Sequence, residues 1–260
     1  MSRLFVDQIG STIEVPAYPK RIVSLVPSQT ELLFDLKLDN RVVGITKFCI
    51  HPAAWFETKS RVGGTKKVNI EKVLELQPDL IIGNKEENTK EDIERLRKIA
   101  PVWLSDVNTY EDALDMINSI GAIANVEELA KSIIDDIQLS FQSLQRNNND
   151  PKKVRYLIWK DPYFQVGKAT FIDAMIQQIG WINLTSELRY PEWNGDDDEM
   201  DYLLLSSEPF PFNHADVEEL QRQFPKTKVV LVDGELFSWY GSRMRKAPAY
   251  FQSLINQLAG

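Results

Sequence analysis

The sequence contains a single cysteine, Cys49, in 260 residues. One thiol excludes an internal disulfide framework and any zinc or iron–sulfur site built from several cysteines. No stretch reaches the roughly 20 apolar residues that a membrane-spanning helix needs. Residues 1–20 also lack the apolar run of a secretory signal. The sequence as written therefore predicts a cytoplasmic location, and a periplasmic one is expected if a leader has been removed.

Basic residues are in the minority, with 30 Lys and Arg against 38 Asp and Glu, which gives a formal net charge of −8. Nucleic acids and anionic membrane surfaces are bound by basic faces, so neither is predicted as the partner. Apolar residues make up 43% and charged residues 26% of the chain. This balance is typical of a globular protein, and a monomer that binds a small molecule is expected.

The common catalytic signatures are missing. The sequence has no G-x-G-x-x-G after a predicted strand, no P-loop, no G-x-S-x-G and no H-E-x-x-H. Its two histidines, His51 and His214, restrict imidazole acid–base chemistry to two places. No nucleophile, base and orienting residue come together in a recognisable pattern. The sequence therefore favours a binding protein over an enzyme.

Apolar strands alternate with helices in the first half of the chain, after a short hairpin at 4–15. Strands are expected at 21–26, 42–46, 80–82 and 101–104, and helices at 28–38, 70–76 and 86–99. Strands without a polar face are typical of a parallel sheet that helices cover on both sides. Ser28 and Glu31 have the spacing of a capping box at the start of the first helix.

The middle of the chain breaks this alternation, because two helices are expected at 110–122 and 126–146 with no strand between them. Apolar residues at three- and four-residue steps mark one face of the second helix: Leu129, Ile133, Ile134, Ile137, Phe141 and Leu144. About 21 helical residues extend about 30 Å, the diameter of a small domain. We therefore predict an N-terminal lobe at 1–124, a backbone helix at 125–148 and a C-terminal lobe at 149–260.

The strand–helix alternation resumes after this helix. Strands are expected at 154–159, 202–206 and 228–232, and helices at 170–179, 214–223 and 247–258. The predicted fold class is α/β, with two Rossmann-like lobes joined by a single long helix and a ligand cleft between the lobes. Small ligands bind at such interfaces and at the carboxyl ends of parallel strands.

Aromatic and small polar residues follow the predicted strands. Examples are TKFCIHP at 46–52, WKDPYF at 159–164, SEPFPF at 207–212 and DGELFSWY at 233–240. Each of these segments brings at least one large ring and a charged group to the end of a strand. Rings and a few hydrogen-bonding groups suit a broad, flat and partly polar ligand.

These segments also carry a family resemblance that covers nearly the whole chain. The runs RIVSLVPSQTELLFDLKLDNRVVGITKFCIHP and RVGGTKKVNIEKVLELQPDLIIGN, followed by the long helix, resemble the cobalamin- and siderophore-binding family of ABC-transporter substrate-binding proteins. The runs IWKDPYFQVGKATFIDAMIQQIG, SSEPFPF and VDGELFSWYGSR resemble its cobalamin-binding-protein-like branch. The resemblance implies a corrinoid, haem or metal-chelate ligand held between two lobes, with no covalent cofactor.

The resemblance also implies a permease partner, which the family contacts through one acidic residue on each lobe. Glu71 matches the position on the first lobe. The second position should lie in a helix after Tyr190-Pro191-Glu192. The stretch 193–201 is instead acidic and lacks helical apolar spacing. The sequence thus predicts Glu71 as one docking residue, and it leaves open whether a permease is a partner.

The candidate ligand-binding residues follow from the strand ends and from this resemblance. They are Ser28, Lys47, Phe48, Cys49, His51, Thr65, Asn84, Glu86, Asn88, Trp159, Tyr163, Glu208, Phe210, Trp239 and Tyr240.

Several of these residues have a second interpretation. Cys49 and His51 either ligate a metal or a chelated cobalt, or contact the ligand and pack. Glu86, Glu87 and Asn88 either bind the ligand or open a helix. Trp159, Tyr163, Trp239 and Tyr240 either line the cleft or pack, whereas Trp103 and Trp181 are expected in the core.

Two further features carry alternatives. The acidic run 196–201 is a solvated loop or a divalent-cation site, and His214 is expected at the start of a helix. The alternative function is a cytosolic corrinoid- or metal-handling enzyme that uses Cys49 as nucleophile. That alternative needs a lowered thiol pKa.

Overall fold

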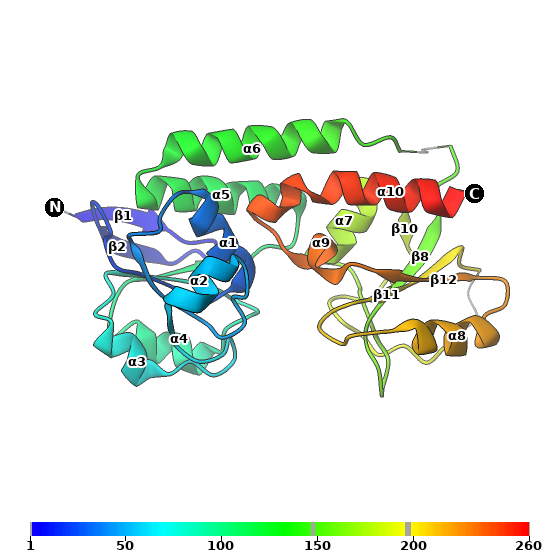
Figure 1. Cartoon of the computed structure of the whole chain (residues 1–260), viewed down its shortest axis with the longest axis horizontal. Helices are drawn as coiled ribbons and strands as arrows, with labels where there is room; N and C mark the ends of the chain where they lie inside the picture. Colours follow the sequence, from blue (N-terminus) through cyan, green and yellow to red (C-terminus); the bar gives the residue numbers. More distant parts are fainter. Residues whose placement is uncertain (1, 147–148, 196–198, 260) are drawn as a thin grey trace. The chain divides into compact units, whose positions relative to one another are not determined.

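A computed structural model describes residues 2–146, 149–195 and 199–259 of the chain (Figure 1). The structure divides into two compact units. The first unit comprises Met1–Val107, Glu111–Gln138 and Tyr240–Arg245. The second unit comprises Asn108–Tyr110, Leu139–Trp239 and Lys246–Gly260. The chain therefore returns to the first unit, at Tyr240–Arg245, after it has built most of the second.

The first unit contains a five-stranded sheet in which neighbouring strands are parallel. Its strands are β3 (Ile22–Ser24), β4 (Val42–Ile45), β5 (Ser60–Arg61), β6 (Leu80–Asn84) and β7 (Val102–Ser105), in the order β5-β4-β3-β6-β7. The chain moves outward from β3 to β5 and then resumes on the other side of β3. The strand order thus reverses between β3 and β6, the place where α/β sheets bind ligands.

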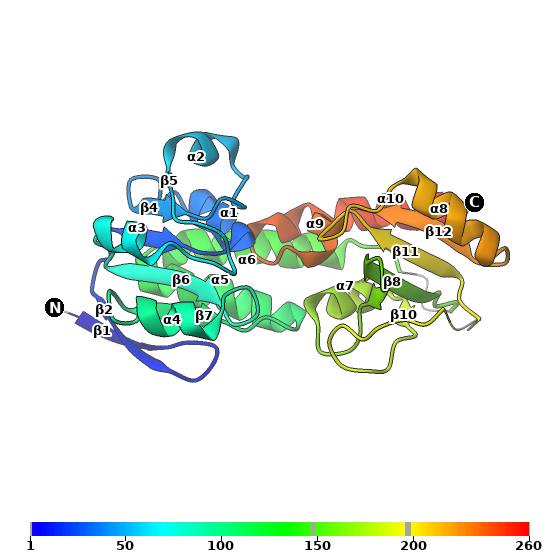
Figure 2. The same cartoon turned by 90° about the horizontal axis from the view of Figure 1, so that it is seen from below.

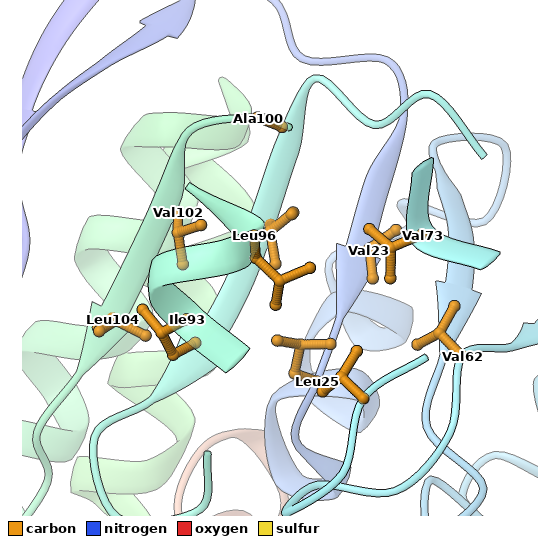
Figure 3. Close-up of a cluster of buried hydrophobic side chains, with 11 residues drawn as sticks. Val23, Leu25, Val62, Val73, Ile93, Leu96, Ala100, Val102 and Leu104 are labelled. Atoms are coloured by element: carbon orange, nitrogen blue, oxygen red, sulfur yellow. The ribbon is translucent and has the colours of Figure 1, made fainter. Parts of the chain in front are cut away.

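Helices cover both faces of this sheet. They are α1 (Pro27–Asp35), α2 (Ala53–Thr58), α3 (Ile70–Glu75), α4 (Lys90–Leu96) and α5 (Tyr110–Ala124). Figure 3 shows Ile93 and Leu96 of α4 packed over strand residues such as Val102 and Leu104. Val73 of α3 belongs to the same buried cluster. In Figure 1, α5 lies on the opposite side of the sheet from α3 and α4.

A hairpin precedes the sheet of the first unit. Strands β1 (Ser2–Val6) and β2 (Thr12–Pro16) pair antiparallel, which confirms the predicted lead-in. The amide of Gln8 in the turn region donates to the carbonyl of Leu104 at 3.0 Å, so the hairpin is attached beside β7.

The second unit contains a second sheet. Its parallel strands are β8 (Lys153–Trp159), β10 (Ile182–Asn183), β11 (Tyr202–Ser206) and β12 (Lys228–Val232), in the order β10-β8-β11-β12. The short strand β9 (Phe164–Gln165) pairs antiparallel with β8. Here the strand order reverses between β8 and β11. The carboxyl ends of these two strands therefore define the expected ligand position of this unit.

The remaining helices are α7 (Phe171–Ile179), α8 (His214–Gln223), α9 (Gly234–Ser238), a 3₁₀ turn η1 (Ser242–Arg245) and α10 (Ala247–Ala259). Figures 1 and 2 show α8 beside β12. Leu220 of α8 is buried against Leu203 and Leu205 of β11 and Val229 of β12. The predicted start of a helix at His214 is confirmed.

The long helix α6 (Glu127–Gln142) contributes residues to both units. It is shorter than the helix predicted at 126–146. Its 16 residues extend about 24 Å, compared with about 30 Å for the predicted helix. Its buried stripe contains Ile133, Ile137 and Phe141 as expected. Leu129 was placed wrongly, since it is 40% exposed and Ala130 occupies the buried position instead.

Two local predictions are wrong. The capping box between Ser28 and Glu31 does not form, because Pro27 is already the first residue of α1 and Glu31 forms an ion pair with Arg243 at 2.6 Å. The helix expected from 86 begins only at Lys90, after the capping residue Thr89. Residues 85–88 form a turn in its place.

The sequence analysis did not predict six short elements, namely α2, α9, η1, β5, β9 and β10. The expected core tryptophans Trp103 and Trp181 are buried, as predicted. Over the described ranges, no helix is both long enough and apolar enough to cross a membrane. The acidic run at 196–201 lies partly outside the described residues.

Candidate ligand-binding site

The carboxyl end of β6 in the first unit carries a buried amide network. The Asn84 side chain accepts the amide N–H groups of Glu86 and Glu87 at 2.8 and 3.0 Å and donates to the hydroxyl of Ser105 at 2.9 Å. Asn88 Oδ1 accepts the Asn84 amide N–H at 2.9 Å. This network explains why the chain turns here before α4 begins.

The same network reaches a neighbouring loop. Asn88 Nδ2 donates to the carbonyl of Thr65 at 3.0 Å. The structure thus brings three of the predicted site residues together, but Thr65, Asn84 and Asn88 are only 8%, 3% and 5% exposed. Their amide groups hold the loops at the strand ends in place. Glu86 is half-buried on the same turn.

Cys49 lies inside the first unit. Its residue exposure is 0%, and its sulfur lies 3.1 Å from the hydroxyls of both Thr30 and Thr46. Burial raises the thiol pKa, which outweighs the opposite effect of the two hydroxyls. A raised pKa is the reverse of what a nucleophilic cysteine needs. His51 is half-buried and is the more accessible member of the predicted pair.

Lys47 and Phe48 form the exposed part of this end of the first unit. Phe48 is 50% exposed, and the Lys47 ammonium lies 4.9 Å from the centre of its ring. The ring also packs against Gly64, where an added Cβ would lie only 3.1 Å from it. Ser28, in the first turn of α1, is 6% exposed.

The second unit presents aromatic rings where its strand order reverses. Trp159 ends β8, and Phe210 lies in the loop after β11; their ring centres are 5.8 Å apart in an edge-to-face arrangement. Trp159 is 43% exposed, and Phe210 is half-buried. The amide of Phe210 donates to the carbonyl of Ile158 at 3.3 Å, which ties the loop to β8. We call Trp159 and Phe210 the ring platform.

Glu208 connects two loops of the second unit. Its Oε1 accepts the Ser238 hydroxyl at 2.6 Å and Trp239 Nε1 at 3.0 Å. Gly234 permits this approach, because an added Cβ would lie 2.5 Å from the Ser206 hydroxyl and 2.7 Å from Glu208 Cγ. Trp239 is only 9% exposed. For Trp239, the packing interpretation therefore describes the structure better than the cleft-lining one.

Two further aromatic predictions have mixed outcomes. Tyr163 is half-buried, and its ring packs edge-to-face on Trp193 at 6.0 Å. Tyr240 belongs to the first unit and is 8% exposed, so it is mainly a packing residue.

Lys160 was missed by the sequence interpretation. Its ammonium donates to Asp216 Oδ1 and to Glu219 Oε2, both at 2.8 Å. These hydrogen bonds raise the pKa of Lys160. Burial opposes ionisation of Asp216, but the hydrogen bond from Lys160 prevails and lowers the pKa of this carboxyl. The motif IWKD placed Lys160 at a strand end. The sequence did not reveal its carboxylate partners, because they lie more than 50 residues away in the chain.

Within the described residues, no three His, Cys, Asp or Glu side chains are grouped so that they could hold a metal ion. A groove of about 590 Å³ does occur in the first unit, lined by residues 11–14 and 97–102. It lies at the amino end of β7, whereas α/β sheets bind ligands at the carboxyl ends. None of the predicted site residues lines it.

The structure therefore defines an α/β protein of two units. Among the described residues, the carboxyl ends of their parallel strands carry the exposed rings of Phe48 and Trp159 together with buried and half-buried polar groups. The periplasmic binding protein family matches residues 22–207, and the chain belongs to this family.

Named relatives agree with this assignment. An uncharacterised ABC-transporter substrate-binding lipoprotein, YvrC of Bacillus subtilis, is 26% identical over 201 residues, which cover 70% of this chain and 63% of that protein. A vitamin B12-binding protein of Vibrio cholerae is 26% identical over 187 residues, which cover 70% of this chain and 67% of that protein. The chain thus matches about two thirds of the length of these relatives.

Solved structures confirm the two-lobed α/β fold. The petrobactin-binding protein YclQ of Bacillus subtilis superposes with a TM-score of 0.81 at 19% identity, covering 97% of this chain and 98% of that one. At this level of identity the likeness concerns the fold.

Proposed function

We propose that this protein is the substrate-binding component of an ABC importer for a metal chelate, and that the chelate is a corrinoid. Relatives with a named ligand include a vitamin B12-binding protein and an iron(3+)-hydroxamate-binding protein. The observation that carries the proposal is the ring platform, because an exposed Trp159 and a half-buried Phe210 occupy the switch point of a parallel sheet. Stacked aromatic contacts contribute about 0.5–1.5 kcal/mol each beyond area burial.

Charge supports a corrinoid over a chelate with several negative charges. Two cations near the strand ends of the first unit are already engaged, because Lys85 pairs with Asp106 at 2.6 Å and the Lys66 ammonium donates to the carbonyl of Glu86. Lys47 is exposed, and its ammonium lies over the Phe48 ring. Lys160 is shared by two carboxylates. With a net charge of −8, these surfaces favour a ligand of low net charge over haem or an anionic siderophore complex.

Binding without chemical change is part of the same proposal. The buried Cys49 with its raised pKa cannot supply the thiolate that the enzymatic alternative requires. A location outside the cytoplasmic membrane, with a permease as partner, follows from the role in an importer. Glu71 in the first turn of α3 is exposed and is the proposed contact on the first unit.

Titration calorimetry with cyanocobalamin, haemin and a ferric hydroxamate tests the proposal. We expect one-to-one binding of cyanocobalamin with a Kd near or below about 1 μM, equivalent to about −8.2 kcal/mol. Tighter binding of haemin or of the ferric chelate would keep the importer role but replace the ligand. If none of the three binds more tightly than about 100 μM, the proposed function is wrong.

A further inference from the structure

The second unit contains an ion cluster of three residues, Lys160, Asp216 and Glu219, which we call the Lys160 cluster. Lys160 directly follows Trp159 at the carboxyl end of β8, and the two carboxylates lie on α8, at its third and sixth residues. Both N–O distances are 2.8 Å. The side chains of Lys160 and Asp216 are 18% and 8% exposed, so water competes little for this pair.

Asp216 serves a second purpose in the same cluster. Its Oδ2 accepts the amide N–H of Asn213 at 2.9 Å, and the Asn213 side chain accepts the Ala215 amide at 2.8 Å. This capping box fixes where α8 begins and therefore where the loop after β11 ends. That loop carries Phe210. The cluster thus joins the residue after Trp159 to the end of the loop that holds Phe210.

We infer that Lys160 is a positioning residue, which holds Trp159 and Phe210 in the edge-to-face arrangement that the ligand contacts. This inference rests on the proposed function. The platform needs such support, because Trp159 is 43% exposed and has little packing of its own. Phe210 packs on Phe212 at 4.8 Å between ring centres, and Phe212 directly precedes Asn213, the capping residue of α8. Loss of the lysine removes the side-chain link between the two ring-bearing segments and leaves the hydrogen bond from the Phe210 amide to the Ile158 carbonyl.

The test is a double-mutant cycle on cyanocobalamin affinity, with haemin and the ferric hydroxamate run alongside. Lys160→Met should weaken binding about five- to tenfold in the otherwise unmodified protein. In the Trp159→Leu background the same change should weaken binding less than twofold, because the platform is already lost. Lys160→Arg, which keeps the charge and can reach both carboxylates, should restore most of the affinity.

The matched control is Lys152→Met. It removes the same charge and the Lys152–Asp150 ion pair at the opposite end of β8. We expect no change in affinity from this variant. Equal losses from Lys160→Met in both backgrounds, or no loss at all, would overturn the inference.

A ligand-free readout separates this inference from the proposed function. In protein labelled with 5-fluorotryptophan, Lys160→Met should shift or broaden the ¹⁹F resonance of Trp159, identified by its absence in Trp159→Leu, and Lys152→Met should not. An unmoved Trp159 resonance refutes the positioning role. If none of the three chelates binds the unmodified protein while the resonance moves, the proposed function fails and the link between Lys160 and Trp159 stands.

Discussion

The two units place different chemistry at the carboxyl ends of similar parallel sheets. In the first unit these ends are held by buried amides and hydroxyls, with Asn84, Asn88 and Thr65 at most 8% exposed. In the second unit they present an exposed tryptophan and the Lys160 cluster. Apart from the exposed Phe48, the described polar groups at the strand ends of the first unit are therefore mainly structural, whereas the strand ends of the second unit present the ring platform.

The amide network of the first unit offers the largest expected effect. Asn84→Ala removes the acceptor for two backbone amides and one donor to the buried Ser105 hydroxyl. Unpaired polar groups should lower the free energy of unfolding by about 1–3 kcal/mol. Urea denaturation measures this loss, and ligand affinity should change less than threefold.

Asn256→Ala is the control for this prediction, because Asn256 is an exposed residue of α10. It should alter stability by less than about 0.5 kcal/mol. A large loss of affinity from Asn84→Ala without any loss of stability would contradict a purely structural role of the network.

The ring platform of the second unit should show the opposite behaviour. Trp159→Leu removes an exposed ring, so stability should change little, while affinity for the chelate should fall about tenfold, equivalent to about 1.4 kcal/mol. Calorimetric titration of the variant measures the effect. Unchanged affinity would mean that the ligand does not use this surface.

The units also differ in their predicted contact with a permease. Glu71 is exposed on α3 of the first unit, and in the second unit the residues described between Tyr190 and Asp201 form no helix. Glu71→Gln should reduce chelate uptake by cells several-fold and leave binding in solution unchanged. Glu75→Gln, on the same helix, should have no effect on uptake. Equal uptake with both variants would exclude docking through Glu71.

The smallest effect concerns Cys49. Because its folded pKa is raised above the ordinary value of 9.0, the unfolded chain loses its thiol proton first as the pH rises. The contribution of Cys49 to stability is therefore complete below pH 9 and declines above it. The free energy of unfolding, measured by denaturation between pH 8 and 10, should fall toward that of Cys49→Ala as the pH rises. A constant difference between the two proteins over this range would show that the thiol pKa is the same in the folded and unfolded chains.

The sequence was sufficient to predict the longer strands and helices of the fold, but not its short elements. Strands β11 and β12 and helix α8 begin and end where apolar runs and turn residues predict. Periodicity failed where a single side chain redirects the backbone. The Asn84 side chain binds the amides that would have begun a helix at Glu86, and apolar spacing cannot report such a bond.

The candidate site was harder to predict than the fold. Composition located the aromatic strand ends, but it could not separate the exposed Trp159 from the buried Trp239, whose indole is bound by Glu208. The buried Cys49 sulfur contacts the hydroxyl of Thr30, which lies 19 residues away in the chain, and composition cannot show such a contact. The Lys160 cluster is a contact between distant segments, so only the folded chain reveals it.

A crystal structure with bound cyanocobalamin tests the central claim most directly. The account predicts that the corrinoid lies in van der Waals contact with the rings of Trp159 and Phe210, with Lys160 still bound to Asp216. A ligand bound elsewhere on the chain, with these two rings left uncovered, would contradict it.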